Sequence, residues 1–177
     1  MNSSDKKTGL VELHLGVLLF GGTALFSKLI PLSALDITVL RCVVAAAVLS
    51  LIVKLSKQKI TLEAGKDYLV AIGLGVIVSL HWVTYFASMQ LSSVAIGMIA
   101  FFTYPVMTVL VEPLVTKSRL QLADVVSGVL VLIGVSLLIP EASLGNDVTL
   151  GIVIGVVSAA LFTARNLLHK RYFSQYS

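Results

Sequence analysis

The residues best suited to chemistry are polar and ionisable side chains within long apolar stretches. Arg41 lies about six residues inside one such stretch, whereas His81 and Tyr85 share a helical face in the next. Ionisable groups are costly inside a membrane-spanning helix, so each of them is a candidate functional residue. A guanidinium group favours an anionic or zwitterionic ligand, although the aromatic residues would suit many other compounds.

A second group of candidates follows one face of a later apolar stretch. Tyr104, Thr108 and Glu112 recur every four residues, which predicts a polar stripe along one helix. Pro105 lacks an N–H and would free the carbonyl group of Phe101, so we expect a kink at this point. Transporters place substrate sites at such interrupted helices near the membrane midplane, but a kink with a purely structural role fits the same residues.

Each candidate residue also has a structural interpretation, and the sequence leaves both open. Arg41 could anchor carbonyl groups at a helix end, and His81 could bond to a neighbouring hydroxyl. Glu112 lies within reach of Lys117 or Arg119, which favours a gating or anchoring ion pair over proton coupling for this residue. The candidates for substrate binding are therefore Arg41, His81, Tyr85, Tyr104 and Thr108, and those for gating or structure are Pro105 and Glu112.

The composition restricts the classes of protein that can carry these residues. The chain has 177 residues, of which 57% are hydrophobic and 12% charged, and its mean hydropathy is +0.99. Soluble domains carry about 25% charged residues, so a water-soluble protein is excluded. A single cysteine excludes a disulfide scaffold. The net charge of +4 is spread between apolar blocks rather than over one basic face, which argues against nucleic-acid binding.

The apolar stretches predict an all-α integral membrane protein. A spanning helix needs about 20 apolar residues, and no alternating pattern supports a β-barrel. Six stretches fit this length, and they cover residues 11–30, 35–53, 68–89, 93–115, 122–139 and 148–168.

Basic residues predict the orientation of the six spans. Ten lysines and arginines lie in the two terminal segments and in the loops at residues 54–67 and 116–121, whereas the loops at residues 31–34, 90–92 and 140–147 contain none. Because basic residues favour the cytoplasmic side, we expect both termini in the cytoplasm, with residues 1–10 forming an N-terminal tail. Lys28 lies at the opposite interface and is expected to extend its amino group towards water.

Small-residue stripes predict two close helix contacts. One contains Gly151, Gly155 and Ala159, and the other runs through Gly75 in the third span.

The first and sixth spans share a short internal similarity. Ala24-Leu25-Phe26 in the first span matches Ala160-Leu161-Phe162 in the sixth, and a basic residue follows each. Two spans that are five positions apart cross the membrane in opposite directions. This pattern is typical of the inverted repeats of secondary transporters.

Several segments together carry a family resemblance, at residues 19–23, 81–95, 104–106, 110–114 and 128–135, and at Arg41. In these segments the chain resembles the EamA domain of the drug/metabolite transporter superfamily. It implies ten helices in two five-helix repeats. Residues 11–139 would then form the first repeat, and residues 148–177 would supply the first helix of an incomplete second repeat.

These observations together predict secondary transport, driven by an ion or substrate gradient, of a small organic metabolite. The alternative is a membrane scaffold, an assembly partner or an inactive truncated product. No enzyme motif, metal-ligand spacing or cofactor motif occurs in the sequence. The expected partners are a small-molecule substrate and the lipid bilayer of the cell membrane. The chain could also associate with itself or pair with a second half, and no nucleic-acid partner is expected.

Overall fold

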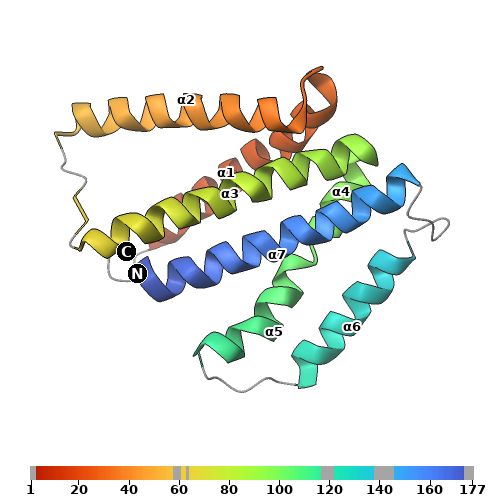
Figure 1. The fold of residues 1–177 in the computed structure, drawn as a ribbon. Helices are drawn as coiled ribbons and strands as arrows, with labels where there is room; N and C mark the ends of the chain where they lie inside the picture. The colour runs from red at the N-terminus through yellow and green to blue at the C-terminus, as the bar shows by residue number, and fades with distance from the viewer. Residues whose placement is uncertain (1–2, 58–60, 63, 117–121, 138–145, 174–177) are drawn as a thin grey trace.

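The chain folds into α-helices that are long enough to cross a membrane. The computed structural model describes residues 3–57, 61–62, 64–116, 122–137 and 146–173. These residues form seven α-helices and no strand, in agreement with the predicted all-α class (Figure 1). The helices are α1 (Ser3–Leu29), α2 (Ala34–Leu55), α3 (Gly65–Leu91), α4 (Val94–Phe101), α5 (Tyr104–Thr116), α6 (Leu122–Ser136) and α7 (Asp147–Phe173).

Five stretches of the described residues have the length and hydropathy of a membrane span. The sixth predicted span corresponds to α7, which continues beyond its predicted end at residue 168. The fifth corresponds to α6, whose 15 residues extend only about 22 Å. Residues 138 and 139 of that predicted span lie outside the described residues. At the N-terminus, α1 begins at Ser3, so much of the predicted tail is helical.

The fourth predicted span is two helices rather than one kinked helix. The helix α4 ends at Phe101 and α5 begins at Tyr104, one residue before Pro105. Proline offers no N–H to the carbonyl four residues earlier, which explains an interruption here. Thr103 bridges the gap, because its hydroxyl donates to the carbonyl oxygen of Ala100 over 2.8 Å and its own carbonyl accepts from Met107 over 3.1 Å.

The helices cross the molecule in alternating directions. In Figure 1, α1 begins and α7 ends at the same end of the bundle, which we call the terminal end; the opposite end is the far end. The successive helices connect these two ends, with α4 and α5 together making one crossing. This is the arrangement expected of a chain with an even number of crossings.

The helix α7 forms the centre of the bundle. It packs against α3, α4 and α5, whereas α2 contacts α3 and α6 contacts α5. Its buried face includes Gly151, Gly155, Ser158 and Ala159. By contrast, the large apolar side chains of α2 are mostly exposed in the isolated chain, as expected for a helix that faces lipid.

Glycine permits the close contact between α7 and its neighbours. A methyl group added at Gly155 would lie 2.7 Å from both Ala100 Cβ and Ser88 Oγ, and one at Gly151 would lie 2.9 Å from Ser92 Cβ. The predicted packing stripe on α7 is therefore confirmed. The second predicted stripe is wrong at Gly75, which has no neighbouring atom within 4 Å of such a methyl group.

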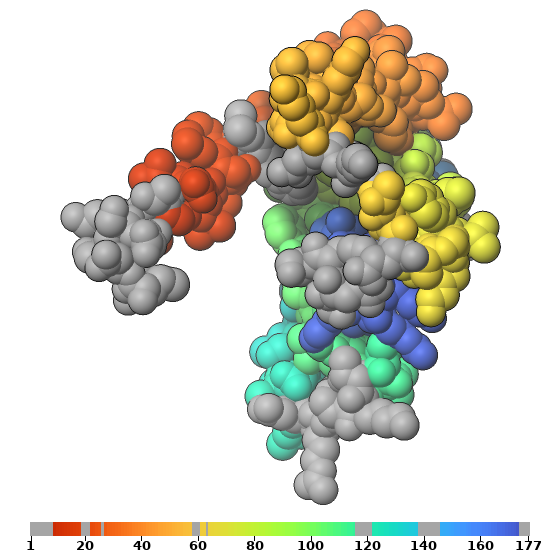
Figure 2. Space-filling view, turned by 90° about the vertical axis from the view of Figure 1, so that its left-hand side faces the viewer, coloured from red at the N-terminus to blue at the C-terminus, as the bar shows by residue number. Residues whose placement is uncertain are grey.

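The helix α1 is attached to the bundle near the far end. Ala24 and Ser27 are buried, whereas residues 9–18 are exposed. Figure 2, which faces the terminal end, shows α1 standing apart from the rest of the bundle. The attachment is polar as well as apolar. Lys28 donates to the carbonyl oxygens of Gln90, over 3.0 Å, and Ser92, over 3.4 Å.

Lys28 is exposed at the far end, and its amino group makes contacts that the sequence did not predict. Its amino group is bonded to carbonyls at the C-terminal end of α3, where a cation is favourable. Gln90 completes the connection, because its amide donates to the carbonyl oxygens of Ser27 over 3.3 Å and Leu32 over 2.9 Å. We call this set of bonds the far-end latch.

Candidate functional site

An aromatic cluster occupies the space between α3, α7 and the break between α4 and α5. Ring centroids lie 5.0 Å apart for Tyr85 and Phe101, 5.0 Å for Phe101 and Tyr104, and 4.9 Å for Tyr104 and Phe162. Such offset and edge-to-face pairs are favourable arrangements of aromatic rings. The cluster consists of His81, Trp82, Tyr85, Phe101, Tyr104 and Phe162.

His81 joins the cluster to α7 through hydrogen bonds. The Ser158 hydroxyl donates to the carbonyl oxygen of His81 over 3.0 Å, and His81 Nδ1 lies 2.8 Å from Ser158 Oγ. Because the hydroxyl hydrogen is already donated, we assign Nδ1 as the donor in the second bond. His81 is 3% exposed, and its bond to a hydroxyl matches the structural interpretation of this residue.

Arg41 lies at the edge of the cluster, on the side of α2. Its guanidinium carbon is 3.7 Å from the centroid of the Trp82 ring, a cation–π contact between α2 and α3. Arg41 and Trp82 line a cavity of about 200 Å³ together with Thr38, Cys42, Ala45 and Val78. No bond from Arg41 to a helix-end carbonyl occurs within the described residues.

Thr108 lies where α5 crosses α7. Its hydroxyl donates to the carbonyl oxygen of Tyr104 over 2.8 Å and lies 3.3 Å from the hydroxyl of Thr163. Thr163 also donates to the same Tyr104 carbonyl, over 3.1 Å. These bonds tie the first turn of α5 to α7 immediately after the break.

A larger cavity of about 610 Å³ opens on the other side of the break. Phe101, Phe102, Tyr104 and Phe162 line one wall, together with Met98, and α1 forms the opposite wall between Glu12 and Val17. Of the predicted substrate-binding residues, Tyr104 lines this cavity and Arg41 lines the smaller one. His81 and Tyr85 are buried between the two cavities, so the predicted residues form one connected cluster but not one cavity wall.

Glu12 is a cavity residue that is missing from the predicted site. It lies one residue inside the start of the first predicted span, where a carboxylate is close to the membrane surface. Its position in the sequence therefore did not mark it as a site residue.

Glu112 makes an ion pair with Lys170, a partner that the sequence did not predict. Its Oε1 lies 2.5 Å from Nζ of Lys170, and this contact joins the ends of α5 and α7 at the terminal end. The predicted partners Lys117 and Arg119 lie outside the described residues.

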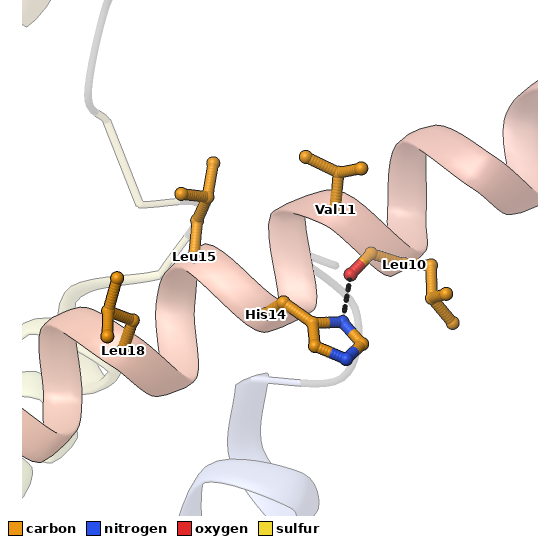
Figure 3. A pocket seen from close by; sticks show the side chains of 5 residues that line it. All are labelled: Leu10, Val11, His14, Leu15 and Leu18. Atoms are coloured by element: carbon orange, nitrogen blue, oxygen red, sulfur yellow. Dashed lines mark hydrogen bonds between the residues drawn. The ribbon is translucent and has the colours of Figure 1, made fainter.

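A third depression lies on α1 alone and has none of the features of a site. Figure 3 shows Leu10, Val11, His14, Leu15 and Leu18 along one helix, and these five lining residues all belong to α1. His14 Nδ1 bonds to the carbonyl oxygen of Leu10 over 2.7 Å, within its own helix. The described residues contain no group of three or more potential metal ligands.

Long apolar helices define an integral membrane protein, and a helix break with a cavity beside it is a common feature of transporters. The chain belongs to the EamA-like transporter family, whose sequence model matches residues 7–139. It is also similar to a protein of Bacillus subtilis (strain 168) named "Uncharacterized transporter YxxF", with 25% identity over 174 residues. That match covers 96% of this chain and 56% of the relative, so the chain spans little more than half of the relative's length. No solved structure matches.

Proposed function

We propose that the chain carries out secondary transport of a small organic metabolite, as all or part of an EamA-like transporter. Membership of the family and the transporter-named relative support membrane transport in general. The observation that carries the finer proposal is the 610 Å³ cavity beside the α4–α5 break, because interrupted helices are where transporters bind their substrates.

In this proposal the two edges of the aromatic cluster have different roles. Tyr104 contributes to the wall that faces the larger cavity, and Arg41 contributes a cation beside the smaller one. His81 and Tyr85 couple the two walls, because their ring centroids lie 5.9 Å apart within the same cluster. A movement of one wall would therefore displace the other. Thr108 holds α5 against α7 at the point where α5 would begin to move.

The break itself supplies a hinge for the alternating exposure of a site to the two sides of the membrane. Pro105 interrupts the hydrogen bonds of the fourth crossing, so α5 can tilt relative to α4. The ion pair of Glu112 and Lys170 then acts as a gate at the terminal end. A gradient of an ion or of the substrate itself would drive the cycle.

The same proposal assigns the repeats and the orientation. Residues 11–139 form the first five-helix repeat, and residues 148–177 begin an inverted second repeat. Both termini face the cytoplasm from the cell membrane, because the ten flanking basic residues gather on their side.

The test is a transport assay in proteoliposomes. The chain, and separately the longest reading frame that contains it, is reconstituted and screened for uptake and counterflow against a panel of labelled metabolites. Counterflow of one compound class above protein-free vesicles supports the proposal. Correctly inserted protein that moves nothing in either form overturns it and favours a scaffold or assembly role.

A further inference from the structure

Arg41 carries a positive charge inside a membrane-spanning helix, and only aromatic rings lie against it. Its guanidinium carbon is 3.7 Å from the centroid of the Trp82 ring and 5.6 Å from that of Phe86. Among the described residues, no hydrogen bond or ion pair joins the guanidinium to an acceptor. A guanidinium group has five N–H donors, and leaving them unpaired within a bilayer is costly. Arg41 therefore requires an acceptor from outside the part of the chain that the structure describes.

We propose that Arg41 binds the phosphate of an anionic phospholipid, whose acyl chain lies along the groove between α2 and α3. This site is separate from the larger cavity, and the inference does not depend on the proposed transport function. A guanidinium group donates two parallel N–H···O bonds to a phosphate. The Trp82 ring contacts the face of the Arg41 guanidinium, so the N–H groups in its plane remain for such an acceptor.

The side chain of Arg41 extends towards the membrane surface at the far end. The helix α2 begins there with Ala34, and the side chains of an α-helix tilt towards its N-terminus. Arg41 follows Ala34 by seven residues, so its Cα atom lies about 10 Å below the start of the helix. The contact with Phe86, one turn closer than Trp82 to the far end of α3, agrees with this direction. A long basic side chain at this depth brings its charge towards the lipid headgroups.

The cavity beside Arg41 has the polarity of a lipid. Its volume of about 200 Å³ is below the roughly 300–1,000 Å³ of small-molecule sites, so it accommodates only part of a larger molecule. Thr38 and Arg41 line the cavity nearer the far end, whereas Ala45 and Val78 line it nearer the membrane centre. A phospholipid in the leaflet at the far end has the same order, with its phosphate outside and its acyl chains inside.

The surface around this cavity favours a ligand that arrives from the bilayer. The side chain of Arg41 is itself exposed in the isolated chain. Large apolar side chains of α2 surround it and are also exposed, namely Leu35, Val39, Leu40, Val43 and Val44. An anionic lipid is favoured over a zwitterionic one, because the ammonium group of a zwitterionic headgroup competes with the guanidinium for the phosphate.

The position of Trp82 allows the site to be observed directly. Trp82 is the single tryptophan of the chain, and bromine atoms on an acyl chain quench tryptophan fluorescence at short range. The full chain is reconstituted in vesicles of phosphatidylglycerol and phosphatidylcholine, and either lipid in turn carries the brominated chains. From the quenching we expect phosphatidylglycerol to bind about fivefold more tightly beside Trp82. Equal quenching by the two lipids, or no quenching because another protein surface covers Trp82, overturns the proposal without any variant.

A soluble headgroup distinguishes a lipid from a free phosphate compound. Glycerophosphoglycerol has the phosphodiester of phosphatidylglycerol but no acyl chains. Added to the vesicles at millimolar concentration, it should leave the quenching by brominated phosphatidylglycerol unchanged, because the acyl chain contributes to binding. Recovery of the fluorescence would assign the site to a free anion and overturn the lipid proposal.

Variants then test whether Arg41 causes the preference. Arg41→Gln removes the charge and should make the two brominated lipids quench Trp82 equally. Arg41→Lys should retain part of the preference, since an ammonium group keeps the charge without the planar pair of donors. Arg171→Gln is the matched control, because the Arg171 guanidinium also lies over a ring, 5.5 Å from the Tyr172 centroid, but at the terminal end. A preference that survives in Arg41→Gln, or that is lost equally in Arg171→Gln, overturns the assignment to Arg41.

Discussion

The two sides of the α4–α5 break are held together in different ways. On one side, α7 contacts α3, α4 and α5 through glycines, buried hydroxyls and rings. On the other side, α1 is fixed by the far-end latch and is exposed over residues 9–18. The two helices that resemble each other in sequence, α1 and α7, therefore have opposite roles in the packing.

The contrast indicates which side is structural and which is available to a ligand. Polar groups between α3 and α7 are bonded to one another: Ser88 donates to the carbonyl of Gly151 over 2.6 Å, and Ser158 bonds to His81. The wall near α1 holds a cavity and a carboxylate instead. Elements with few buried contacts are the ones that move most easily, so we expect α1, rather than α7, to move during transport.

The largest effect is expected from a larger side chain at Gly155, which would disrupt the close packing of α7. Gly155→Leu would force atoms into Ala100 and Ser88, and we expect a loss of about 3 kcal/mol or more of stability. The measurement is thermal unfolding in detergent, followed by size-exclusion chromatography. Gly75→Leu is the matched control on α3, because nothing lies within 4 Å of a methyl group there. Equal effects of the two variants would contradict the central position of α7.

A smaller effect is expected from the hydroxyl that joins α7 to α3. Ser158→Ala removes the bond donated to the His81 carbonyl oxygen and the bond accepted from His81 Nδ1, and it leaves Nδ1 only the Ser158 carbonyl, 3.2 Å away. Losing these two buried hydrogen bonds should cost about 2 kcal/mol of unfolding free energy. Ser79→Ala is the control, because that hydroxyl bonds within its own helix, to the carbonyl of Gly75. A Ser158 variant that is no less stable than the control would show that the Ser158 hydroxyl contributes nothing to the contact between α3 and α7.

The class of fold follows from the sequence because the apolar spans are long and their flanking charges are strongly biased. Pro105 likewise marks the break, since the missing N–H is a local property of one residue. The sequence does not indicate which faces meet. Gly155 and Gly75 lie in similar stripes, yet only the first packs, because packing depends on which helix lies opposite.

The site shows the same limit. His81 and Tyr85 could be placed on one face by their spacing, and the structure brings them into one cluster. The separation of Arg41 from Tyr104 depends on how α2 and α1 lie around that cluster, which spacing within single helices does not specify. Lys170 was not expected to pair with Glu112, because 58 residues separate them in the chain.

A variant of Arg41 tests whether the edge of the aromatic cluster next to α2 contributes to transport. Arg41→Ala removes the cation over the Trp82 ring, and we expect transport by the complete protein to fall about two- to fivefold, the equivalent of an exposed cation–π contact. Arg41→Lys should restore only part of the rate, since an ammonium group does not stack as a planar guanidinium does. Initial rates in proteoliposomes measure both, with Lys54→Ala on the same helix as the control. A wild-type rate for Arg41→Ala would exclude this edge of the cluster from transport.

The smallest effect on stability is expected at the terminal end, where α5 and α7 are joined by Glu112 and Lys170. The pair is short, at 2.5 Å, but Lys170 remains 64% exposed and Glu112 32% exposed. Exposed ion pairs contribute little because water and salt screen them, so Glu112→Gln should cost about 0.5 kcal/mol or less. A double-mutant cycle with Lys170→Gln, measured by denaturant unfolding at low and high salt, isolates the pair. A coupling energy that vanishes at high salt fits a contact that can open and close at little cost, as a gate requires. A coupling above about 2 kcal/mol that persists in salt would instead make the terminal end of α5 part of the rigid side, and the hinge at Pro105 would then have nothing to move.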